Sequence, residues 1–486
     1  STELSSIESK LGKEEDDFHN SKGLGWFVTG LFVVGCLAGG GIVALPTALI
    51  QTTPYLGVAI LLAMAAIVTF TSYILGRSWN LLIDCWPEYK DYTRKPYPEI
   101  GFRAAGPRMR AIVSLVCITS QFGIGVVYLL LSSKNIKDAA KAFLDIDLSF
   151  CVVVLIVAVC LLPFTFLRSP VDFWWVIVFA MLTTAGAIVL ILVGAATDYG
   201  ACSPHRSLPD LKPSNIFLAL GTFLFSFCGH ASFPTIQHDM RKPTDFTKST
   251  YLAFGITTLM YIVTGVAGFL AYGDSLRSSV INSIQTIAIQ QAINLLITVH
   301  LVLTLIMAIN PVNQEMEELF RVPHTFCWKR VLVRTGVMAV ATFVAESVPS
   351  FGPLLDLVGG STLTLSAIVF PCIFFVLLNA RREKMLETGK DNGPVTDIQE
   401  VVKYNSRVIL VACAVTIALG FVGGGAATFS AIREIISTKF EYPCYVSAFM
   451  DRGSMGASTS TNCCGRFQNL TVFDSVTCSL PDTQFY

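Results

Sequence analysis

Residues 36–46 read CLAGGGIVALP in one-letter code, three consecutive glycines with a proline close behind, in the middle of an apolar segment. Each glycine costs a helix about 1 kcal/mol relative to alanine. Interrupted backbone at membrane depth is tolerated only where it is buried in protein or lines a cavity. There, free N–H groups and a half-helix N-terminus can bind a carboxylate. Close helix packing is the alternative, because Gly35 and Gly39 also have the spacing of a packing motif.

A second apolar segment carries a matching interruption. Residues 225–234 read FSFCGHASFP, again small and polar residues followed by a proline. Gly39 and Gly229 each lie about 14 residues from the start of their segments. Each of these two segments is the first of five consecutive apolar segments. Corresponding breaks in two halves indicate inverted repeats with a binding site between them. A second glycine run, at 423–425, lies outside the two five-segment halves and shows that glycines alone do not identify a site.

The composition predicts a membrane protein. Of 486 residues, 53% are hydrophobic and 14% charged, against about 25% charged in soluble domains, and the mean hydropathy is +0.62. The formal net charge is zero, so there is no electrostatic reason to expect nucleic acid as a partner. The expected surroundings are a lipid bilayer.

Eleven segments are long and apolar enough to cross the hydrocarbon layer, which takes roughly 20 residues of helix. They are 25–50, 55–79, 110–132, 150–168, 173–196, 214–238, 250–272, 288–310, 331–347, 352–379 and 406–432. The ninth is the shortest and contains Arg334 and Glu346 near its ends. The sequence thus predicts an all-α integral membrane protein with about eleven transmembrane helices, arranged as two five-helix repeats and an added eleventh helix.

The positive charges predict the orientation of this bundle. If the N-terminus is cytosolic, the inside loops carry 24 of the 34 lysine and arginine residues, as the positive-inside rule requires. Residues 1–23 lack the features of a signal peptide and are predicted to be a cytosolic tail before a transmembrane domain at 24–432. An odd helix number then places a tail at 433–486 outside the cell or in a lumen.

The C-terminal tail agrees with this orientation. It holds four cysteines and the only glycosylation sequon, namely Cys444, Cys463, Cys464, Cys478 and Asn469. Both features suit an oxidising, glycosylating compartment. Cys202, in a predicted outer loop, makes five disulfide candidates, so one is expected to stay free or to pair between chains. The other nine cysteines are assigned to packing.

Ionisable residues at membrane depth are candidates for a functional role, because burying them is costly. His230 lies in the second interrupted segment, and histidine titrates near physiological pH, as proton coupling requires. The alternative is a neutral histidine that joins two helices. His300 is a second candidate, and Asp356 is the only carboxylate well inside a predicted helix. We find no phosphate-binding loop, zinc-protease motif or nucleophile elbow, so no enzyme activity, metal or cofactor is expected.

These segments resemble the amino acid/auxin permease family, which includes the vesicular inhibitory and the proton-coupled amino acid transporters. Residues 39–46 match its pattern Gly-x-Gly-Ile-[Leu/Val]-x-Leu-Pro, and 227–237 match its second signature around Gly-His. Segments 127–130 and 310–312 also look like the family's. The resemblance covers roughly residues 24–432 and implies the fold of the bacterial leucine transporter with alternating access.

The resemblance also implies where a small amino acid would bind. Backbone N–H groups of the glycine run would receive its carboxylate, and the second break would face its ammonium group or side chain. The substrate-binding residues expected on this basis are Gly39, Gly40, Gly41, Ser226, Cys228 and Gly229. Two departures from the family pattern weaken any substrate assignment taken from the family. Gly40 stands where many members have serine or threonine, and about 50 residues follow the last helix.

The expected function is secondary active transport of amino acids, small or neutral ones first, coupled to protons through His230 or His300. The protein is expected in the plasma membrane or in an endolysosomal or vesicular membrane. A sodium-coupled symporter is one alternative, with Thr298 or Thr304 near the ion. A sensor that binds amino acids without transport is the other. The sequence predicts neither a particular amino acid nor an oligomeric state.

Overall fold

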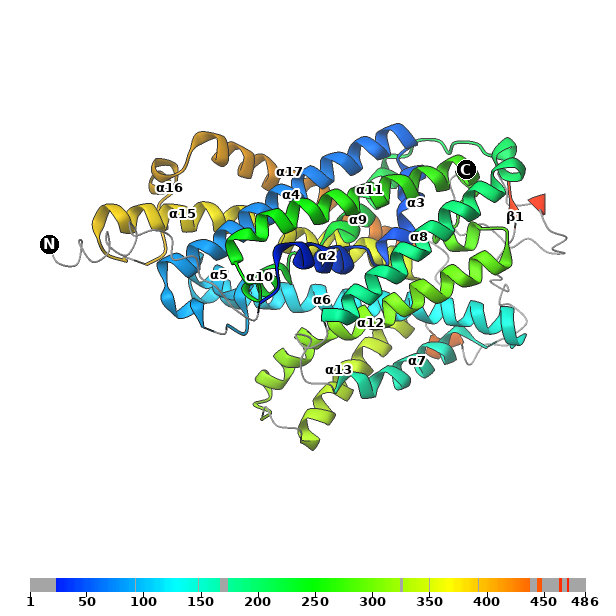
Figure 1. Ribbon diagram of the computed structural model, residues 1–486, viewed down its shortest axis with the longest axis horizontal. Coiled ribbons are helices and arrows are strands. Elements are labelled where there is room, and N and C mark those ends of the chain that lie inside the picture. Colours follow the sequence, from blue (N-terminus) through cyan, green and yellow to red (C-terminus); the bar gives the residue numbers. More distant parts are fainter. Residues whose placement is uncertain are drawn as a thin grey trace.

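The structure, a computed structural model, describes residues 23–91, 93–146, 148–166, 174–323, 327–348, 350–391, 393–437, 444–447, 463–465 and 470–471. These residues form a bundle of long helices that run broadly along the longest axis of the molecule (Figure 1). Helices α5 and α16 lie at one end of the bundle and strand β1 lies at the other (Figure 1). We call these the α16 end and the tail end.

Helices occupy all eleven predicted positions. They are α2 (Trp26–Leu37) with α3 (Gly41–Gln51), α4 (Pro54–Cys85), α6 (Pro107–Leu144), α7 (Phe150–Thr165), α8 (Trp174–Cys202), α9 (Pro213–Phe227) with α10 (Phe233–His238), α11 (Phe246–Tyr272), α12 (Ile287–Leu319), α13 (Trp328–Ser347), α14 (Phe351–Val358) with α15 (Phe370–Thr388), and α17 (Arg407–Ser437). Among the described residues, seven helices, or eight with the bent pair α2 and α3 taken as one, are long and apolar enough to cross a membrane. The number eleven therefore stays a prediction.

Short elements complete the described chain. They are η1 (Pro87–Lys90), α5 (Pro96–Ala105), η3 (Ser203–His205), η4 (Pro243–Asp245), η5 (Gly273–Ser275), η6 (Val280–Ser283), the π-helical turns η7 (Gly359–Leu363) and η8 (Leu365–Val369), α16 (Ile398–Tyr404), α18 (Cys444–Ser447), β1 (Cys463–Cys464) and β2 (Leu470–Thr471). The strands pair antiparallel, with Cys463 opposite Thr471.

Local chemistry explains where the long helices begin and end. Pro54 and Pro107 begin α4 and α6, where proline loses no helical hydrogen bond and its fixed φ suits the first turn. Gly273 and Gly389 follow α11 and α15 with φ of 54° and 69°, a conformation that glycine adopts without steric penalty. These boundaries follow from single residues, so they could be expected from the sequence.

The outward face of α17 is apolar. Val408, Val411, Val415, Leu419 and Val422 follow one another at helical spacing and are all exposed. A continuous stripe of this kind would be unfavourable in water and is favourable against lipid. The exposed side chains therefore agree with a protein whose outer surface lies in a bilayer.

The glycine run of α17 serves helix packing. A Cβ atom on Gly424 would lie 2.7 Å from the carbonyl oxygen of Gly360, and one on Gly360 would lie 2.8 Å from the Cβ of Ala427. The two backbones are thus in direct contact. Gly425 faces open space instead, which makes it a useful control position.

Candidate functional site

The first predicted break is present at the expected residues. Helix α2 ends at Leu37, α3 begins at Gly41, and the two axes differ by 63°. The first N–H groups of α3 have no partner within their own helix. In this structure the N–H of Ile42 donates to the Gly39 carbonyl oxygen, at 3.2 Å, and the N–H of Gly39 donates to the Leu37 carbonyl oxygen, at 2.8 Å. A helix interrupted at Ala38 to Gly40 is the arrangement that the glycine run predicted.

The glycines are required because neighbouring helices come very close to this break. A Cβ atom on Gly39 would collide with the hydroxyl of Tyr128 on α6 and would lie 3.3 Å from Nε2 of His300 on α12. A Cβ atom on Gly41 would collide with Oγ of Ser226 and would lie 2.8 Å from its Cα. The break between α2 and α3 therefore faces α6, α9 and α12, and the groups around it are uncharged.

The second predicted break is also present, and a tyrosine links it to the first. Helix α9 ends at Phe227 and α10 begins at Phe233. The hydroxyl of Tyr261 on α11 lies 2.7 Å from the Ser226 carbonyl oxygen and 2.9 Å from the Leu37 carbonyl oxygen. Because one hydroxyl reaches the last turn of both half-helices, the two breaks are held side by side. Sequence reasoning missed Tyr261, since nothing in its own segment marks it.

The remaining residues of the predicted second break point in different directions. A Cβ atom on Gly229 would lie 3.2 Å from Cδ2 of Leu37, so this glycine faces the first break. The Sγ atom of Cys228 lies 4.0 Å from the Leu363 carbonyl oxygen, so its side chain is directed toward η7. Gly229 thus faces the break between α2 and α3, whereas the Cys228 side chain faces η7.

His230 is buried against α4. Its Nε2 atom lies 2.8 Å from Oγ of Ser72, 3.1 Å from Oγ1 of Thr71 and 3.3 Å from the Val68 carbonyl oxygen. Its ring packs 4.9 Å from that of Phe233, centroid to centroid. These contacts match the interpretation of a histidine that joins two helices, and a role in coupling stays a prediction.

His300 presents a free acceptor to the first break. Its Nδ1 atom lies 2.9 Å from the Ala180 carbonyl oxygen and 2.8 Å from Oγ1 of Thr184. A carbonyl only accepts, so Nδ1 carries the proton and the neutral ring keeps a lone pair on Nε2. That Nε2 atom is buried and has no hydrogen-bond partner among the described residues, and it faces Gly39. The ring therefore offers an acceptor where a ligand donor would lie.

The two threonines proposed for sodium, Thr298 and Thr304, differ in their surroundings. Oγ1 of Thr304 donates to the His300 carbonyl oxygen, at 2.7 Å. Thr298 is partly buried and lies two residues before His300, and therefore on another face of α12. Coupling to sodium through either residue stays a prediction.

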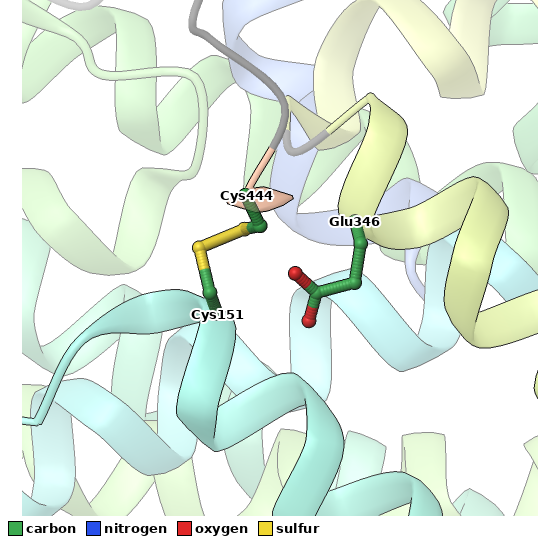
Figure 2. A group of neighbouring side chains, drawn as sticks. All are labelled: Cys151, Glu346 and Cys444. Atoms are coloured by element: carbon green, nitrogen blue, oxygen red, sulfur yellow. A yellow bond between two sulfur atoms is a disulfide. The ribbon is translucent and has the colours of Figure 1, made fainter. Parts of the chain in front are cut away.

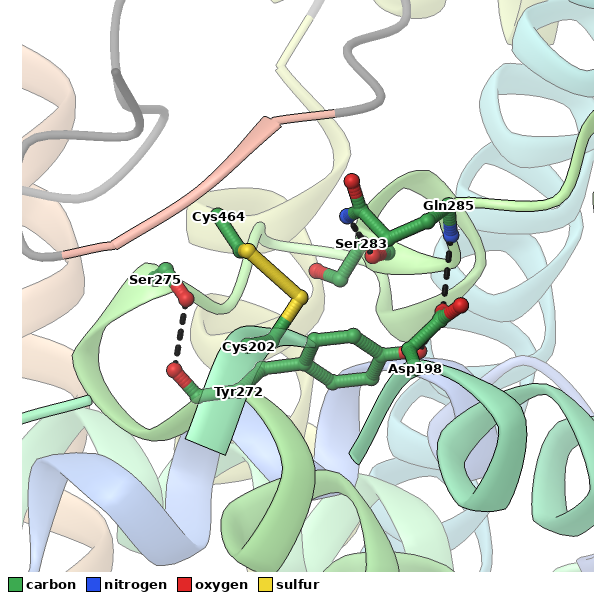
Figure 3. Close-up of a disulfide and its surroundings, with 7 residues drawn as sticks. All are labelled: Asp198, Cys202, Tyr272, Ser275, Ser283, Gln285 and Cys464. Carbon is green, nitrogen blue, oxygen red and sulfur yellow. Dashed lines mark hydrogen bonds between the residues drawn. A yellow bond between two sulfur atoms is a disulfide. The ribbon is translucent and has the colours of Figure 1, made fainter. Parts of the chain in front are cut away.

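Two disulfides join the C-terminal tail to the tail end of the bundle. Cys151 pairs with Cys444 (Figure 2) and Cys202 pairs with Cys464 (Figure 3). Cys463 is disulfide-bonded as well. Cys478 and Asn469 lie outside the described residues.

The pairing of Cys151 corrects its assignment to packing. It is the second residue of α7, at the end of the helix that the tail reaches. Counting it brings the cysteines on the tail side from five to six, an even number, which removes the reason to expect an unpaired one. The eight free cysteines of the described chain are Cys36, Cys85, Cys117, Cys160, Cys228, Cys327, Cys372 and Cys413.

The first disulfide explains a cluster that resembles a metal site. The ligand atoms of Cys151, Cys444 and Glu346 lie within 4.8 Å of one another (Figure 2). Two of these three atoms are bonded to each other, and a disulfide sulfur is not the thiolate that metals bind. The cluster is therefore a disulfide beside a carboxyl group.

The second disulfide lies beside a buried polar loop. Asp198 accepts hydrogen bonds from the Tyr272 hydroxyl, at 2.6 Å, and from the Gln285 backbone N–H, at 2.8 Å (Figure 3). Oγ1 of Thr47 on α3 donates to the Arg277 carbonyl oxygen, at 2.6 Å. The segment that joins α11 to α12 is thereby anchored to α8 and to α3.

We expect the double substitution Cys151→Ser and Cys202→Ser to release the tail without unfolding the bundle, because the interrupted helices lie elsewhere. A disulfide constrains a chain by about 2–4 kcal/mol, so limited proteolysis should remove the tail more than about tenfold faster. Cys160→Ser, a free exposed cysteine on α7, is the control and should leave the rate unchanged. Equal protection of all three proteins would contradict the tethering.

The fold and the facing breaks define a membrane transporter of the leucine-transporter fold, while the expected count of five plus five helices and an eleventh stays a prediction. Solved structures show the same fold. MhsT in complex with L-phenylalanine aligns with a TM-score of 0.54 and 12% identity, covering 85% of this chain and 100% of that one. Mhp1 in its inward-facing conformation aligns with a TM-score of 0.52 and 13% identity, covering 86% and 92%.

The chain belongs to the family described as transmembrane amino acid transporter protein, whose profile matches residues 22–390. Similar curated proteins include two amino acid transporters of Arabidopsis thaliana. AVT1J is 22% identical, over 78% of this chain and 89% of that protein. AVT1H is 27% identical, over 71% and 79%. The family resemblance drawn from the two interrupted segments is confirmed, and the protein is a multi-pass member of a transporter family.

Proposed function

We propose that the chain is a secondary active transporter of small or neutral amino acids, coupled to protons. Its substrate binds between the break that separates α2 from α3 and the break that separates α9 from α10. The observation that carries the proposal is the link by Tyr261, which holds Leu37 and Ser226 together across the two breaks. Two unwound segments side by side offer N–H donors from one helix and carbonyl acceptors from the other. An amino acid needs both, for its carboxylate and its ammonium group.

The groups around the break support a neutral substrate. Backbone N–H groups at Gly39 to Gly41 would receive the carboxylate, aided by the N-terminal end of α3. The N–H of Gly39, which here donates to the Leu37 carbonyl oxygen at 2.8 Å, would exchange that acceptor for the ligand. Nε2 of His300 would accept from the ammonium group. The side chains that a Cβ atom on the glycine run would meet are uncharged, namely Tyr128, Leu131, Ser226 and His300. A charged substrate side chain would have no counter-charge among them.

The disulfides support the proposed orientation. Disulfides persist in oxidising compartments, so the tail end would face the cell exterior or a lumen and the N-terminus the cytosol. Plasma, endolysosomal and vesicular membranes all provide such a face, with Asn469 glycosylated there. Mass spectrometry of the protein from its native membrane would test both features.

Uptake by purified protein in liposomes tests the proposed function. Radiolabelled amino acids are screened at two pH values in sodium-free buffer, with and without an inward proton gradient. We expect saturable uptake that the gradient stimulates. Loss of all uptake without sodium would refute the proton assignment and favour the sodium symporter. Saturable binding with no counterflow would favour a sensor.

A further inference from the structure

The buried carboxyl group of Asp356 lies against the helix that leads into the second break. Its side chain is 6% exposed, and its Oδ1 atom accepts a hydrogen bond from Oγ1 of Thr222 on α9, at 2.6 Å. A Cβ atom on Gly221 would lie 2.8 Å from the Asp356 Cα. Helices α9 and α14 are therefore in direct contact at this carboxyl group. Among the described residues, neither His230 nor His300 is its hydrogen-bond partner.

Among the described residues, the elements around α14 form no ion pair with this group. Helices α6, α9 and α17 and the turn η7 pack against α14. Lys134 of α6 lies over the ring of Phe351 at the start of α14, with its Nζ 5.6 Å from the ring centroid. Glu434 of α17, which interacts electrostatically with Asp356, is another acid. Among the described residues, α9 and η7 contribute hydroxyl groups and no charge, and none of the ion pairs includes Asp356.

A carboxylate in this position is costly, because a buried charge without a cationic partner loses its hydration and regains little. The neutral, protonated form avoids that cost. The packing of α14 on α9 seen here therefore suits the protonated form, whereas the ionised form needs water or a cation to reach it. Binding of a proton to Asp356 and the packing of α14 on α9 therefore favour each other.

The contact is connected to the proposed site by hydrogen bonds along α9. Oγ of Ser226 donates to the Thr222 carbonyl oxygen, at 2.7 Å, and the same Oγ lies where a Cβ on Gly41 would collide with it. The carboxyl group, Thr222, Ser226 and the glycine run thus form one contiguous series of contacts. A change in how α14 packs on α9 would move a wall of the site.

We propose that Asp356 is the proton-binding residue that couples transport to the proton gradient, an inference that rests on the proposed function. The carboxylate takes one proton from the medium on one side when water reaches it, and releases the same proton on the other. No other bond forms or breaks. His230, which holds α4, and His300, which faces the substrate, then keep structural and binding roles.

Asp356→Asn tests this proposal in liposomes, because asparagine imitates the protonated shape and cannot titrate. With an inward gradient of about one pH unit, wild type should accumulate substrate up to about tenfold if one proton accompanies it. The variant should equilibrate substrate without accumulating it, while counterflow at equal pH persists. Glu434→Gln, the control at the neighbouring acid, should accumulate substrate as wild type does.

Undiminished accumulation by Asp356→Asn would overturn the proposal, as would loss of accumulation in Glu434→Gln alone. Wild-type transport without any response to the gradient would overturn it too, while leaving amino acid transport intact. If wild type transports nothing, the proposed function fails, and infrared spectroscopy decides on the proton site. The band of a protonated buried carboxyl should then be present in wild type at neutral pH and shifted in Asp356→Glu. Identical spectra would overturn the assignment.

If Asp356→Asn fails to fold, Asp356→Glu serves in its place. Glutamate keeps the titratable group but moves it by one methylene, so gradient-driven accumulation should persist with a shifted pH midpoint. A purely structural role would leave that midpoint where it is, and an unchanged midpoint would count against the proposal.

Discussion

Replacing Gly41 with valine is expected to abolish amino acid uptake. A Cβ atom there would collide with Oγ of Ser226 and lie 2.8 Å from its Cα, and a backbone atom cannot rotate away as a side chain can. Overpacking of this kind typically costs about 1–3 kcal/mol, and the added methyl groups would also cover the N–H groups at the start of α3. Uptake per folded protein, normalised by size-exclusion chromatography, is the measurement.

A glycine from another run provides the matched control. Gly425 lies in the run of α17, and a Cβ atom on it would have nothing within 4 Å. Gly425→Val therefore makes the same chemical change in a helix of similar apolarity, and uptake should be retained. Gly40→Leu should lose uptake, because its Cβ would already lie 3.2 Å from Cε1 of Tyr128. Normal uptake by either site variant would refute the placement of the site.

Replacing Glu317 with glutamine is expected to destabilise the protein by about 3–5 kcal/mol, the usual effect of removing one partner from a buried ion pair. Its Oε1 atom lies 2.9 Å from Nε of Arg330 and 2.5 Å from Nε of Arg334. The three side chains are 5%, 6% and 0% exposed, respectively. Glutamine keeps the shape but leaves two buried guanidinium groups without their carboxylate. Thermal unfolding in detergent would measure the loss.

An exposed ion pair gives the control for this variant. Glu387 and Lys403 lie 3.0 Å apart and are each more than half exposed, so Glu387→Gln should leave the unfolding temperature nearly unchanged. Replacing Glu317, Arg330 and Arg334 together by apolar residues should restore much of the stability, since no charge is then left alone. An unchanged unfolding temperature in Glu317→Gln would show that the cluster is not a buried one in the folded protein.

The same cluster explains how a short helix with an arginine near its end can belong to the bundle. Arg334 weakens the ninth segment as an apolar span, and its sequence alone offers no compensation. In the fold, Arg334 meets Glu317 from the end of α12 and the Thr165 carbonyl oxygen from the end of α7. The charge that lowers the hydropathy of α13 joins it to two neighbours.

Much of the fold could be predicted from the sequence, because its signals are local. The length of an apolar segment decides whether it becomes a helix, and prolines mark where helices begin. Glycines decide where the first apolar segment is interrupted, between α2 and α3. The breaks after Leu37 and Phe227 are present where residues 36–46 and 225–234 predicted them. The family resemblance rested on the same residues and is confirmed. The roles of His230, His300 and Thr298 in coupling stay predictions.

The tertiary structure alone decided which residues meet. Cys151 and Cys444 are 293 residues apart, Thr222 and Asp356 are 134 apart, and Tyr261 reaches two half-helices at once. No local pattern encodes such pairs, because they depend on how separate helices pack. The runs at 39–41 and 423–425 make this plain: the same three glycines interrupt one helix and allow another to pack closely. Local backbone energetics set where the chain can break, and the surrounding helices determine what each break is for.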